Sequence, residues 1–323
     1  MSTIAKSSED QSGAAIVARS LVKDFPGIRA VDHLSFTVKD GEIFGLVGAD
    51  GAGKSTTLRM LAAVLTPDEG TATVAGWDVV REGDAVKDNI SYMPQRFGLY
   101  EDLTVDENIR FYADIFGVRG RDREERASRL LPAAGLQQFR QRLAGQLSGG
   151  MKQKLALTCA LIHTPKILVL DEPTNGVDPV SRRDFWSILY SLSTEGLTIL
   201  TSTAYLDEAE RCHRVALLHK GRLLFCDTPS QLKKNLPGEV VAVISSAARR
   251  LRGELERAEG VSSLVLVGDG LHLVLDDAER RIPELRTKLT VAGLPFDDIV
   301  RITPTIEDLM VATVEADMSE VNS

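Results

Sequence analysis

One segment of the sequence has residue types and a spacing that could hold a chain of phosphate groups. It fits the pattern G-x-x-x-x-G-K-[ST] and reads Gly48-Ala49-Asp50-Gly51-Ala52-Gly53-Lys54-Ser55-Thr56. Glycines allow consecutive backbone N–H groups to turn inward around phosphate oxygens. The lysine of such a loop bridges the β- and γ-phosphates of a nucleotide, and the serine offers its hydroxyl to Mg²⁺. Asp50 is an oddity here, because a carboxylate repels phosphate unless it points away.

Two adjacent carboxylates follow a second apolar run and could complete this chemistry. The run from Ile167 to Leu170 is followed by Asp171 and Glu172. A buried parallel strand would bring Asp171 to its carboxyl end, where α/β sheets place ligands. There Asp171 would hold Mg²⁺ through water, and Glu172 would act as the general base that polarises an attacking water. The alternative is a strand with an ordinary acidic turn, and the phosphate loop favours the catalytic interpretation.

The flanks of the phosphate loop predict the elements that would position it. Ile43 to Val47 is a short apolar run typical of a buried parallel strand. Lys54 to Leu65 has apolar residues at helical spacing. Strand, glycine loop and helix are the context that the motif requires, and the helix N-terminus adds positive potential for phosphate. The alternative, a glycine-rich turn before a chance lysine, does not explain these flanks.

With four further motifs, these residues resemble the nucleotide-binding subunit of an ABC transporter. The resemblance covers about residues 16 to 235, and the motifs stand in the family's order and spacing. It implies that Phe25, in Val22-Lys23-Asp24-Phe25, stacks on adenine. It also implies that Gln95, in Tyr92-Met93-Pro94-Gln95, reaches Mg²⁺ and the attacking water. Gln95, Lys54 and Glu172 are thus the expected catalytic residues, and Ser55, Gln95 and Asp171 the expected metal site.

Two of the motifs imply that the chain works with a partner subunit. Leu147-Ser148-Gly149-Gly150-Met151-Lys152-Gln153 resembles the family signature, which contacts the nucleotide held by a second subunit. Ser148 would begin a helix, so its hydroxyl and the N–H groups of Gly149 and Gly150 can bind a γ-phosphate. Asn175-Gly176-Val177-Asp178 resembles the loop that lies across the dimer interface, with Asp178 near the nucleotide. One chain would then hold two half-sites and no complete one.

The sequence departs from the family pattern at one position that matters for turnover. After the strand that ends at Ser202, the family has Ser/Thr-Thr-His, whereas this chain has Ser202-Thr203-Ala204. The following residues stay in register, so Ala204 occupies the place of a histidine that contacts the γ-phosphate and orients Glu172. His213 is too far along the chain to replace it. Losing one positioned polar group beside developing charge lowers a rate on the order of a hundredfold or more.

Two interpretations of Ala204 stay open. In the first, which we favour, the chain pairs with a different ATPase subunit that has the histidine, and the two sites are unequal. In the second, the chain forms a homodimer that turns over slowly. The first agrees with a resemblance to the amino-terminal half of tandem two-ATPase exporter subunits, which can lack this histidine.

The amino-acid composition limits the class of protein, its partners and the compartment in which it works. The 323 residues carry a net charge of −8, which argues against a nucleic-acid partner. The hydrophobic fraction of 43% is that of an ordinary globular protein, and no apolar run is long enough to span a bilayer. The three cysteines have neither metal nor disulfide spacing, which fits a reducing compartment. Residues 1–14 are rich in serine and charge, and we expect a disordered tail.

The order of patterns predicts two domains. Residues 15–237 would form an ABC nucleotide-binding domain, with a helical subdomain at about 96–163. Residues 238–323 read as β-α-β-β-α-β, which predicts a ferredoxin-like accessory domain. Thr305-Ile306-Glu307-Asp308-Leu309 resembles the terminal segment of export-type ATPase subunits. The fold class is therefore an α/β P-loop NTPase of the ABC type with a small α+β domain.

These observations predict a subunit that binds ATP and Mg²⁺ and hydrolyses ATP to power an ABC exporter. Its partners would be a second nucleotide-binding domain and separate membrane-spanning permease subunits, and it would lie on the cytoplasmic face of the inner membrane. One alternative is a non-transport ABC ATPase acting on DNA ends or ribosomes, which predicts a coiled coil, a second cassette or a basic patch. Another is a regulatory half-site with little turnover, which Ala204 supports and Glu172 opposes.

Overall fold

The computed structural model describes residues 13–268 and 270–321, which form two compact units. The first unit comprises the described residues up to 204 together with 218–224, and the second comprises 205–217 and the described residues from 225 onward. The tail predicted at 1–14 lies outside the described residues except at its end, where Ala14 already begins a strand.

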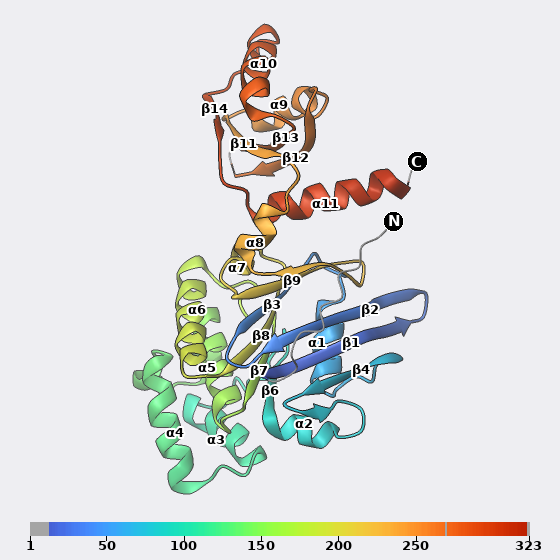
Figure 1. Ribbon diagram of the computed structural model, residues 1–323. Helices are drawn as coiled ribbons and strands as arrows, with labels where there is room; N and C mark the ends of the chain where they lie inside the picture. The colour runs from blue at the N-terminus through green and yellow to red at the C-terminus, as the bar shows by residue number, and fades with distance from the viewer. Residues whose placement is uncertain (1–12, 269, 322–323) are drawn as a thin grey trace. The chain divides into compact units, whose positions relative to one another are not determined.

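The first unit holds two sheets and the helices that pack on them (Figure 1). Its elements are β1 (Ala14–Phe25), β2 (Ile28–Lys39), β3 (Ile43–Val47), α1 (Lys54–Leu61), β4 (Glu69–Val74), β5 (Trp77–Asp78), α2 (Gly83–Asn89), β6 (Ile90–Met93), α3 (Val105–Ile115), α4 (Gly120–Ala133), η1 (Gln137–Phe139), η2 (Ala144–Gln146), α5 (Gly149–Leu161), β7 (Ile167–Asp171), α6 (Pro179–Thr194) and β8 (Thr198–Thr203). Two further strands, β9 (Arg214–His219) and β10 (Arg222–Asp227), each contain residues of both units.

The strands that carry the phosphate loop and the carboxylates are close together in one sheet. Its order is β10-β9-β3-β8-β7-β6, and β3, β8, β7 and β6 run parallel. Every residue of β3 and β7 is buried, in agreement with the apolar runs that predicted them. Because the strands are parallel, the loop after β3 and Asp171 at the end of β7 reach the same edge of the sheet.

Helix α1 follows the phosphate loop as predicted, but it ends four residues earlier than Leu65, at Leu61. Ala63 takes a left-handed backbone conformation with φ 53°, which stops the helix. The backbone N–H groups of Val64 and Leu65 then turn back to the carbonyl oxygen of Arg59. The helical spacing of the apolar residues therefore continued past the true end of the helix.

The second sheet of the first unit is antiparallel, with the order β2-β1-β4-β5. A tight connection joins β1 to β2, and Phe25 pairs with Ile28 across it. Both side chains are exposed at the tip of this hairpin. The hairpin is the element that presents the predicted adenine-stacking residue.

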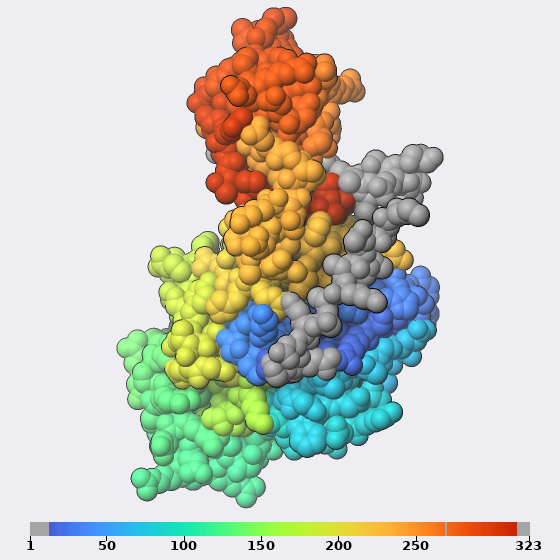
Figure 2. All heavy atoms as spheres, viewed as in Figure 1, coloured from blue at the N-terminus to red at the C-terminus, as the bar shows by residue number. Residues whose placement is uncertain are grey.

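The residues between Gln95 and the signature motif gather in one lobe of the first unit, drawn in green in Figure 2. Helix α3 contacts both α4 and α5. Thr104 and Glu107 form a reciprocal capping box that begins α3. Val105 and Ile109 on α3 are buried, whereas Phe116, directly after the end of the helix, is exposed.

The second unit is built around a four-stranded antiparallel sheet. Its further elements are α7 (Leu206–Ala209), α8 (Pro229–Lys234), β11 (Glu239–Ile244), α9 (Ala248–Leu255), β12 (Val261–Val267), β13 (Gly270–Leu275), α10 (Ala278–Val291), β14 (Asp298–Arg301) and α11 (Ile306–Val321). The sheet order is β12-β13-β11-β14. This order, with one helix in each crossover, is that of a ferredoxin-like sandwich. Helices α9 and α10 close its apolar core.

Helix α11 was not predicted, and it changes where the units divide. It packs on β12 and β13 and also contacts α7 and α8. This packing accounts for the grouping of α7 and α8 with the second unit, although the sequence analysis placed the boundary after residue 237. Within the described ranges, no helix has the length and apolar character needed to cross a bilayer.

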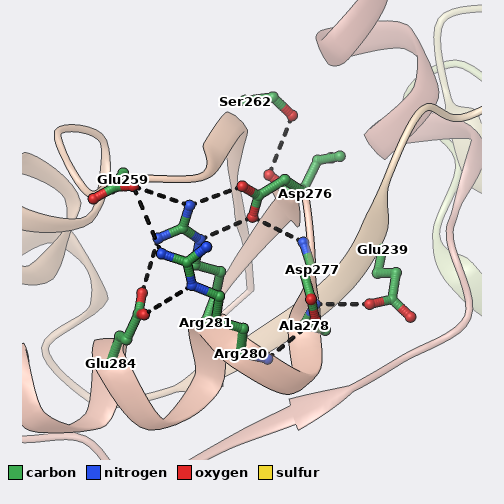
Figure 3. A network of polar contacts seen from close by, with 10 residues as sticks. Glu239, Glu259, Ser262, Asp276, Asp277, Ala278, Arg280, Arg281 and Glu284 are labelled. Carbon is green, nitrogen blue, oxygen red and sulfur yellow. Dashed lines mark hydrogen bonds and ion pairs between the residues drawn. The ribbon is translucent and has the colours of Figure 1, made fainter.

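A buried arginine ties three segments of the second unit together (Figure 3). Arg281 on α10 is only 4% exposed, and its guanidinium donates to Asp276, Glu284 and Glu259. Gly260 passes so close that a Cβ atom there would collide with this guanidinium. The hydrogen bonds from Arg281 lower the pKa of Asp276 to about 2. The network fixes the start of α10 against the turn before β12.

Candidate functional site

A cleft of about 440 Å³ lies in the first unit, at the edge of the sheet where the phosphate loop emerges. Its lining comes from the β1–β2 hairpin, the phosphate loop and the segments that follow β6 and β7. The lining residues are Phe25, Ile28, Ala30, Asp50, Gly51, Ala52, Gly53, Lys54, Ser55, Thr56, Gln95, Glu172 and Asn175. Residues far apart in the sequence thus meet in one cavity, as the motifs predicted.

Lys54 is held by its own loop and by Glu172, the acid that directly follows β7. Its Nζ donates to the carbonyl oxygens of Gly48, at 2.7 Å, and Ala49, at 3.1 Å. Oε1 of Glu172 lies 3.2 Å from the same nitrogen. An ammonium group has three N–H bonds, and these three oxygens account for them. A phosphate oxygen that enters the cleft would therefore compete with Glu172 for this cation.

Asp171 is buried at the end of β7 and receives several hydroxyl groups. Ser55 Oγ donates to its Oδ1 at 2.8 Å, and Ser202 Oγ donates to the same oxygen at 2.7 Å. Tyr92 lies near the second oxygen, with a longer distance of 3.4 Å. Burial and the charge of Asp171 raise the pKa of Tyr92, so the phenol remains a neutral donor. These contacts fix the orientation of the carboxylate next to the phosphate loop.

Glu172 is oriented by both its side chain and its backbone. Gln95 Nε2 donates to Oε2 at 3.0 Å, and Asn175 Nδ2 donates to the same oxygen at 3.2 Å. The residue has a left-handed φ of 47°, which is unusual for a side chain of this size. Its backbone N–H donates to Ser202 Oγ at 3.0 Å. The carboxylate therefore faces the cleft in a defined orientation, between Lys54 and Gln95.

Gly53 is the glycine of the phosphate loop that the surroundings require most. Its φ is 97°, in the left-handed region, and a Cβ atom would collide with the carbonyl oxygen of Ala30 on β2. Gly51 also has a left-handed φ, of 79°, but open space surrounds it. The loop therefore passes β2 too closely for any side chain at position 53.

The hairpin side of the cleft offers apolar surface. Phe25 is 42% exposed and Ile28 is 60% exposed, and both line the cleft. Lys23 Nζ lies 5.8 Å from the centre of the Phe25 ring. An aromatic face in the same cleft as an anion-binding loop suits a ligand with a flat ring at one end and phosphates at the other.

The signature residues and Asp178 are not part of the cleft lining, whereas Asn175, at the start of the interface loop, lines the cleft. Ser148 is exposed and caps α5, where its Oγ accepts from the N–H of Met151 at 3.3 Å. This is the predicted helix start, with Gly149 and Gly150 in the first turn. Asp178 caps α6 by accepting from the N–H of Ser181, and this hydrogen bond lowers its pKa. Ser148 and Asp178 thus lie at helix N-termini, outside the cavity of their own chain.

Ala204 follows the last residue of β8 and is exposed. Its methyl group has no polar atom to offer to Glu172. The carboxylate of Glu172 instead contacts Lys54, Gln95 and Asn175. The structure thus holds the Glu172 carboxylate in place without the histidine that the family pattern has at position 204.

Sequence reasoning assigned no role to three residues that contact the carboxylates. Ser202, Tyr92 and Asn175 were noted only as members of a strand or a motif. Ser202 is the register partner of Asp171 in the parallel pair of β7 and β8. The sequence contained a signal for this contact, because the apolar runs that form β7 and β8 both end in polar residues. Using the signal requires knowing that these two strands are neighbours in the sheet.

The cleft and the sheet define a class of protein: a P-loop domain with a carboxylate pair beside its phosphate loop. Comparison with known proteins gives the family. The ABC transporter family matches residues 31–175. The daunorubicin/doxorubicin resistance ATP-binding protein DrrA of Streptomyces peucetius is 41% identical over 244 residues, which are 75% of this chain and 74% of that protein. The chain belongs to the ATP-binding proteins of ABC transporters.

Two further comparisons extend this result. The probable multidrug ABC transporter ATP-binding protein YbhF of Escherichia coli (strain K12) is 44% identical over 302 residues, which are 92% of this chain. The chain spans about half the length of that relative, 52%. A dimeric post-hydrolysis structure of the ATP-binding cassette MJ0796, bound to ADP and Pi, matches with a TM-score of 0.60 and 25% identity, over 66% of this chain and 98% of that one. The predicted fold class, a P-loop NTPase of the ABC type, is confirmed.

Proposed function

We propose that this chain binds ATP in the described cleft and hydrolyses it as one half of a paired ABC ATPase that powers export across a membrane. The observation that carries the proposal is the set of contacts in which Lys54, Asp171 and Glu172 surround the phosphate loop. The phosphate loop would hold the β- and γ-phosphates, and Phe25 would stack on the adenine ring.

The oxygen atoms beside the loop fit a magnesium ion. Ser55 Oγ and Asp171 Oδ1 are 2.8 Å apart, and hydroxyl and carboxylate oxygens are the hard ligands that Mg²⁺ prefers. Ser55 would bind the ion directly, Asp171 would hold it through water, and Gln95 would complete the set. When bound, the ion would neutralise charge on the β- and γ-phosphates.

Glu172 would supply the base for attack by water on the γ-phosphate. Its carboxylate would accept the proton of the attacking water, and Gln95, which donates to Glu172 Oε2, would help to orient that water. Lys54 would move from Glu172 to the phosphate and stabilise the negative charge of the transition state. The arrival of phosphate would thus free one oxygen of the base for water.

A second nucleotide-binding domain would complete each site. Ser148, Gly149, Gly150 and Asp178 lie at helix N-termini outside the cleft of their own chain. N–H groups at such termini bind anions, so these residues suit the γ-phosphate on a partner. The dimeric cassette that matches this chain supports a paired arrangement. ATP binding would close the pair, and hydrolysis would reopen it.

The coupled work would be export through separate permease subunits. The names of the relatives refer to multidrug transport and to resistance against daunorubicin and doxorubicin. The chain would lie on the cytoplasmic face of the inner membrane, bound to those subunits. The described helices of this chain do not include one that could cross a bilayer, so membrane passage would belong to the partners.

Ala204 favours a second form of the same proposal, in which this chain is the weaker half-site of a pair with a different ATPase. The experiment is ATP turnover of the purified chain against its own concentration, beside Ala204→His. A rate that rises with the square of concentration, and rises further with histidine, supports a working homodimer with a weakened switch. ATP binding with negligible turnover in both proteins supports the unequal pair, and absence of ATP binding overturns the proposal.

A further inference from the structure

A serine at the end of β8, to which the sequence analysis assigns no role, joins the two carboxylate residues of the site. Ser202 on β8 is fully buried. Its Oγ donates to Asp171 Oδ1 at 2.7 Å and accepts from the backbone N–H of Glu172 at 3.0 Å. Asp171 and Glu172 are neighbours in the chain, so one hydroxyl group holds the side chain of the first and the backbone of the second.

The two hydrogen bonds determine which way the hydroxyl group points. A serine hydroxyl has one proton, and Asp171 Oδ1 is an acceptor only. The proton must therefore point to Asp171, and a lone pair must face the N–H of Glu172. In such a chain each hydrogen bond polarises the next. A carboxylate that lost this donor would keep the hydroxyl of Ser55 on the same oxygen but could rotate more freely.

The backbone of Glu172 gives this contact a second consequence. A φ of 47° is unfavourable for glutamate, so the surrounding structure must hold the residue in this conformation. The N–H of Glu172 donates a hydrogen bond to Ser202 Oγ, which helps to hold this peptide group in place. The direction in which the Glu172 side chain leaves the backbone depends on this φ. Ser202 thus acts on the base as well as on the carboxylate beside Ser55.

We propose that Ser202 is a positioning residue that sets Asp171 for metal binding and Glu172 for proton abstraction in one arrangement; the proposal rests on the proposed ATPase function. It acts through these two residues and does not touch the substrate. Outer-shell partners of this kind usually change metal affinity or activity by about 10–100-fold when removed. The effect should therefore fall on metal-dependent binding and on kcat, and not on the binding of the nucleotide itself.

The test compares Ser202→Ala with Thr201→Val, which also removes one buried hydroxyl group from β8. Among residues 13–268 and 270–321, the one hydrogen-bond partner of the Thr201 hydroxyl is the carbonyl oxygen of Ser202, at a long 3.5 Å. Affinity for a fluorescent ATP analogue is measured with Mn²⁺ and with EDTA, together with kcat, KM and the melting temperature. For Ser202→Ala we expect two quantities to fall about tenfold or more: the increase in nucleotide affinity that Mn²⁺ causes, and kcat. The nucleotide affinity measured in EDTA should stay within about twofold of the parent value.

Ser202→Thr, which keeps a hydroxyl group on the same carbon, should recover the Mn²⁺-dependent gain if it folds. Thr201→Val should match the parent within about twofold. The proposal would be overturned if Mn²⁺ increased the nucleotide affinity of Ser202→Ala as much as that of the parent. It would also be overturned if Thr201→Val lost as much of this increase as Ser202→Ala does. If the parent binds ATP without turnover, the Mn²⁺ measurement still decides the role of Ser202. If the parent does not bind ATP at all, the proposed function fails and this inference fails with it.

Discussion

At the scale of single residues, a substitution of Glu172 can separate ATP hydrolysis from ATP binding. Glu172→Gln keeps the size of the side chain and an oxygen that can accept from Gln95 and Asn175, but it cannot take a proton. Turnover should fall by about a hundredfold or more, because that is the usual contribution of a positioned base. Phosphate release measures the loss, and ATP affinity should stay near that of the parent.

The control for this change is Glu195→Gln, an exposed glutamate beyond the end of α6. It alters the net charge by the same amount and should leave turnover unchanged. A parent-like rate in Glu172→Gln would show that another group takes the proton.

Gly51 and Gly53 separate backbone strain from steric collision in the phosphate loop. Both have a left-handed φ, but only Gly53 faces a backbone carbonyl oxygen, that of Ala30. Gly51→Ala should destabilise the protein by about 1–2 kcal/mol from strain alone. Gly53→Ala should destabilise it further, because the loop and β2 must also move apart. Urea unfolding midpoints compare the two, and equal midpoints would contradict the assigned collision.

The phosphate loop, the acids and the missing histidine could all be predicted from the sequence, because each depends on residues adjacent in the chain. Lys54 contacts Glu172, and Ser55 contacts Asp171. The contact between Asp171 and Ser202 could not be predicted in the same way. It depends on which strands are neighbours and on their register, and the local sequence of β7 or β8 determines neither.

At the scale of elements, the start of α10 depends on the network around Arg281 (Figure 3). The pKa of Asp276 is lowered to about 2, below the ordinary value near 4 for an aspartate. A lowered carboxylate pKa adds stability above the ordinary pKa, and this stability is lost as the pH falls towards 2. The melting temperature of the parent should therefore drop in acid, and Asp276→Asn should reduce that drop.

The matched control for this prediction is Asp297→Asn, an exposed aspartate of the same unit that is not part of the network. At neutral pH, Asp276→Asn should melt below the parent, and the difference should narrow between pH 4 and pH 2. A constant difference across this range would show that the charge of Asp276 does not stabilise the fold.

Element boundaries show where sequence patterns lose information. The spacing of the apolar residues predicted a helix that continues beyond Leu61, where α1 ends. Apolar periodicity contains no information about the left-handed backbone conformation at Ala63 that stops the helix. Helix α11 was missed although Thr305 and Asp308 form a cap at its start. That signal was present in the sequence, but the segment was interpreted as a terminal motif. The strands and helices of the second unit kept the predicted order.

At the scale of the whole molecule, the division of each site between two chains allows a mixing experiment. Ser148→Ala removes the hydroxyl group offered to a partner, and Glu172→Gln removes the base of the chain itself. Each variant alone should be inactive. In a homodimer, a mixed pair combines one intact Glu172 with one intact Ser148. Half of the pairs would be mixed, with one working site each, so a mixture should recover about a quarter of the parent rate.

Equal mixtures of the parent with each variant serve as controls for dilution of active chains. A mixture of the two variants that stays as inactive as its components, while the parent is active, would exclude sites shared between chains. If this chain pairs with a different subunit, each pair holds one copy of this chain, so a mixture of the two variants with that subunit should show no gain over the average of the separate variants.

The pairing of Asp171 with Ser202 across β7 and β8 has a consequence for refolding. A slip of one residue between these strands would turn Ser202 to the opposite face of the sheet, away from both carboxylates. A sheet with the wrong register could still give a strong far-ultraviolet signal and a collapsed core. Recovery of metal-dependent nucleotide affinity would then report the moment at which the central strands reach their native alignment. Nucleotide binding would then serve as a kinetic probe for the formation of native register in the central sheet.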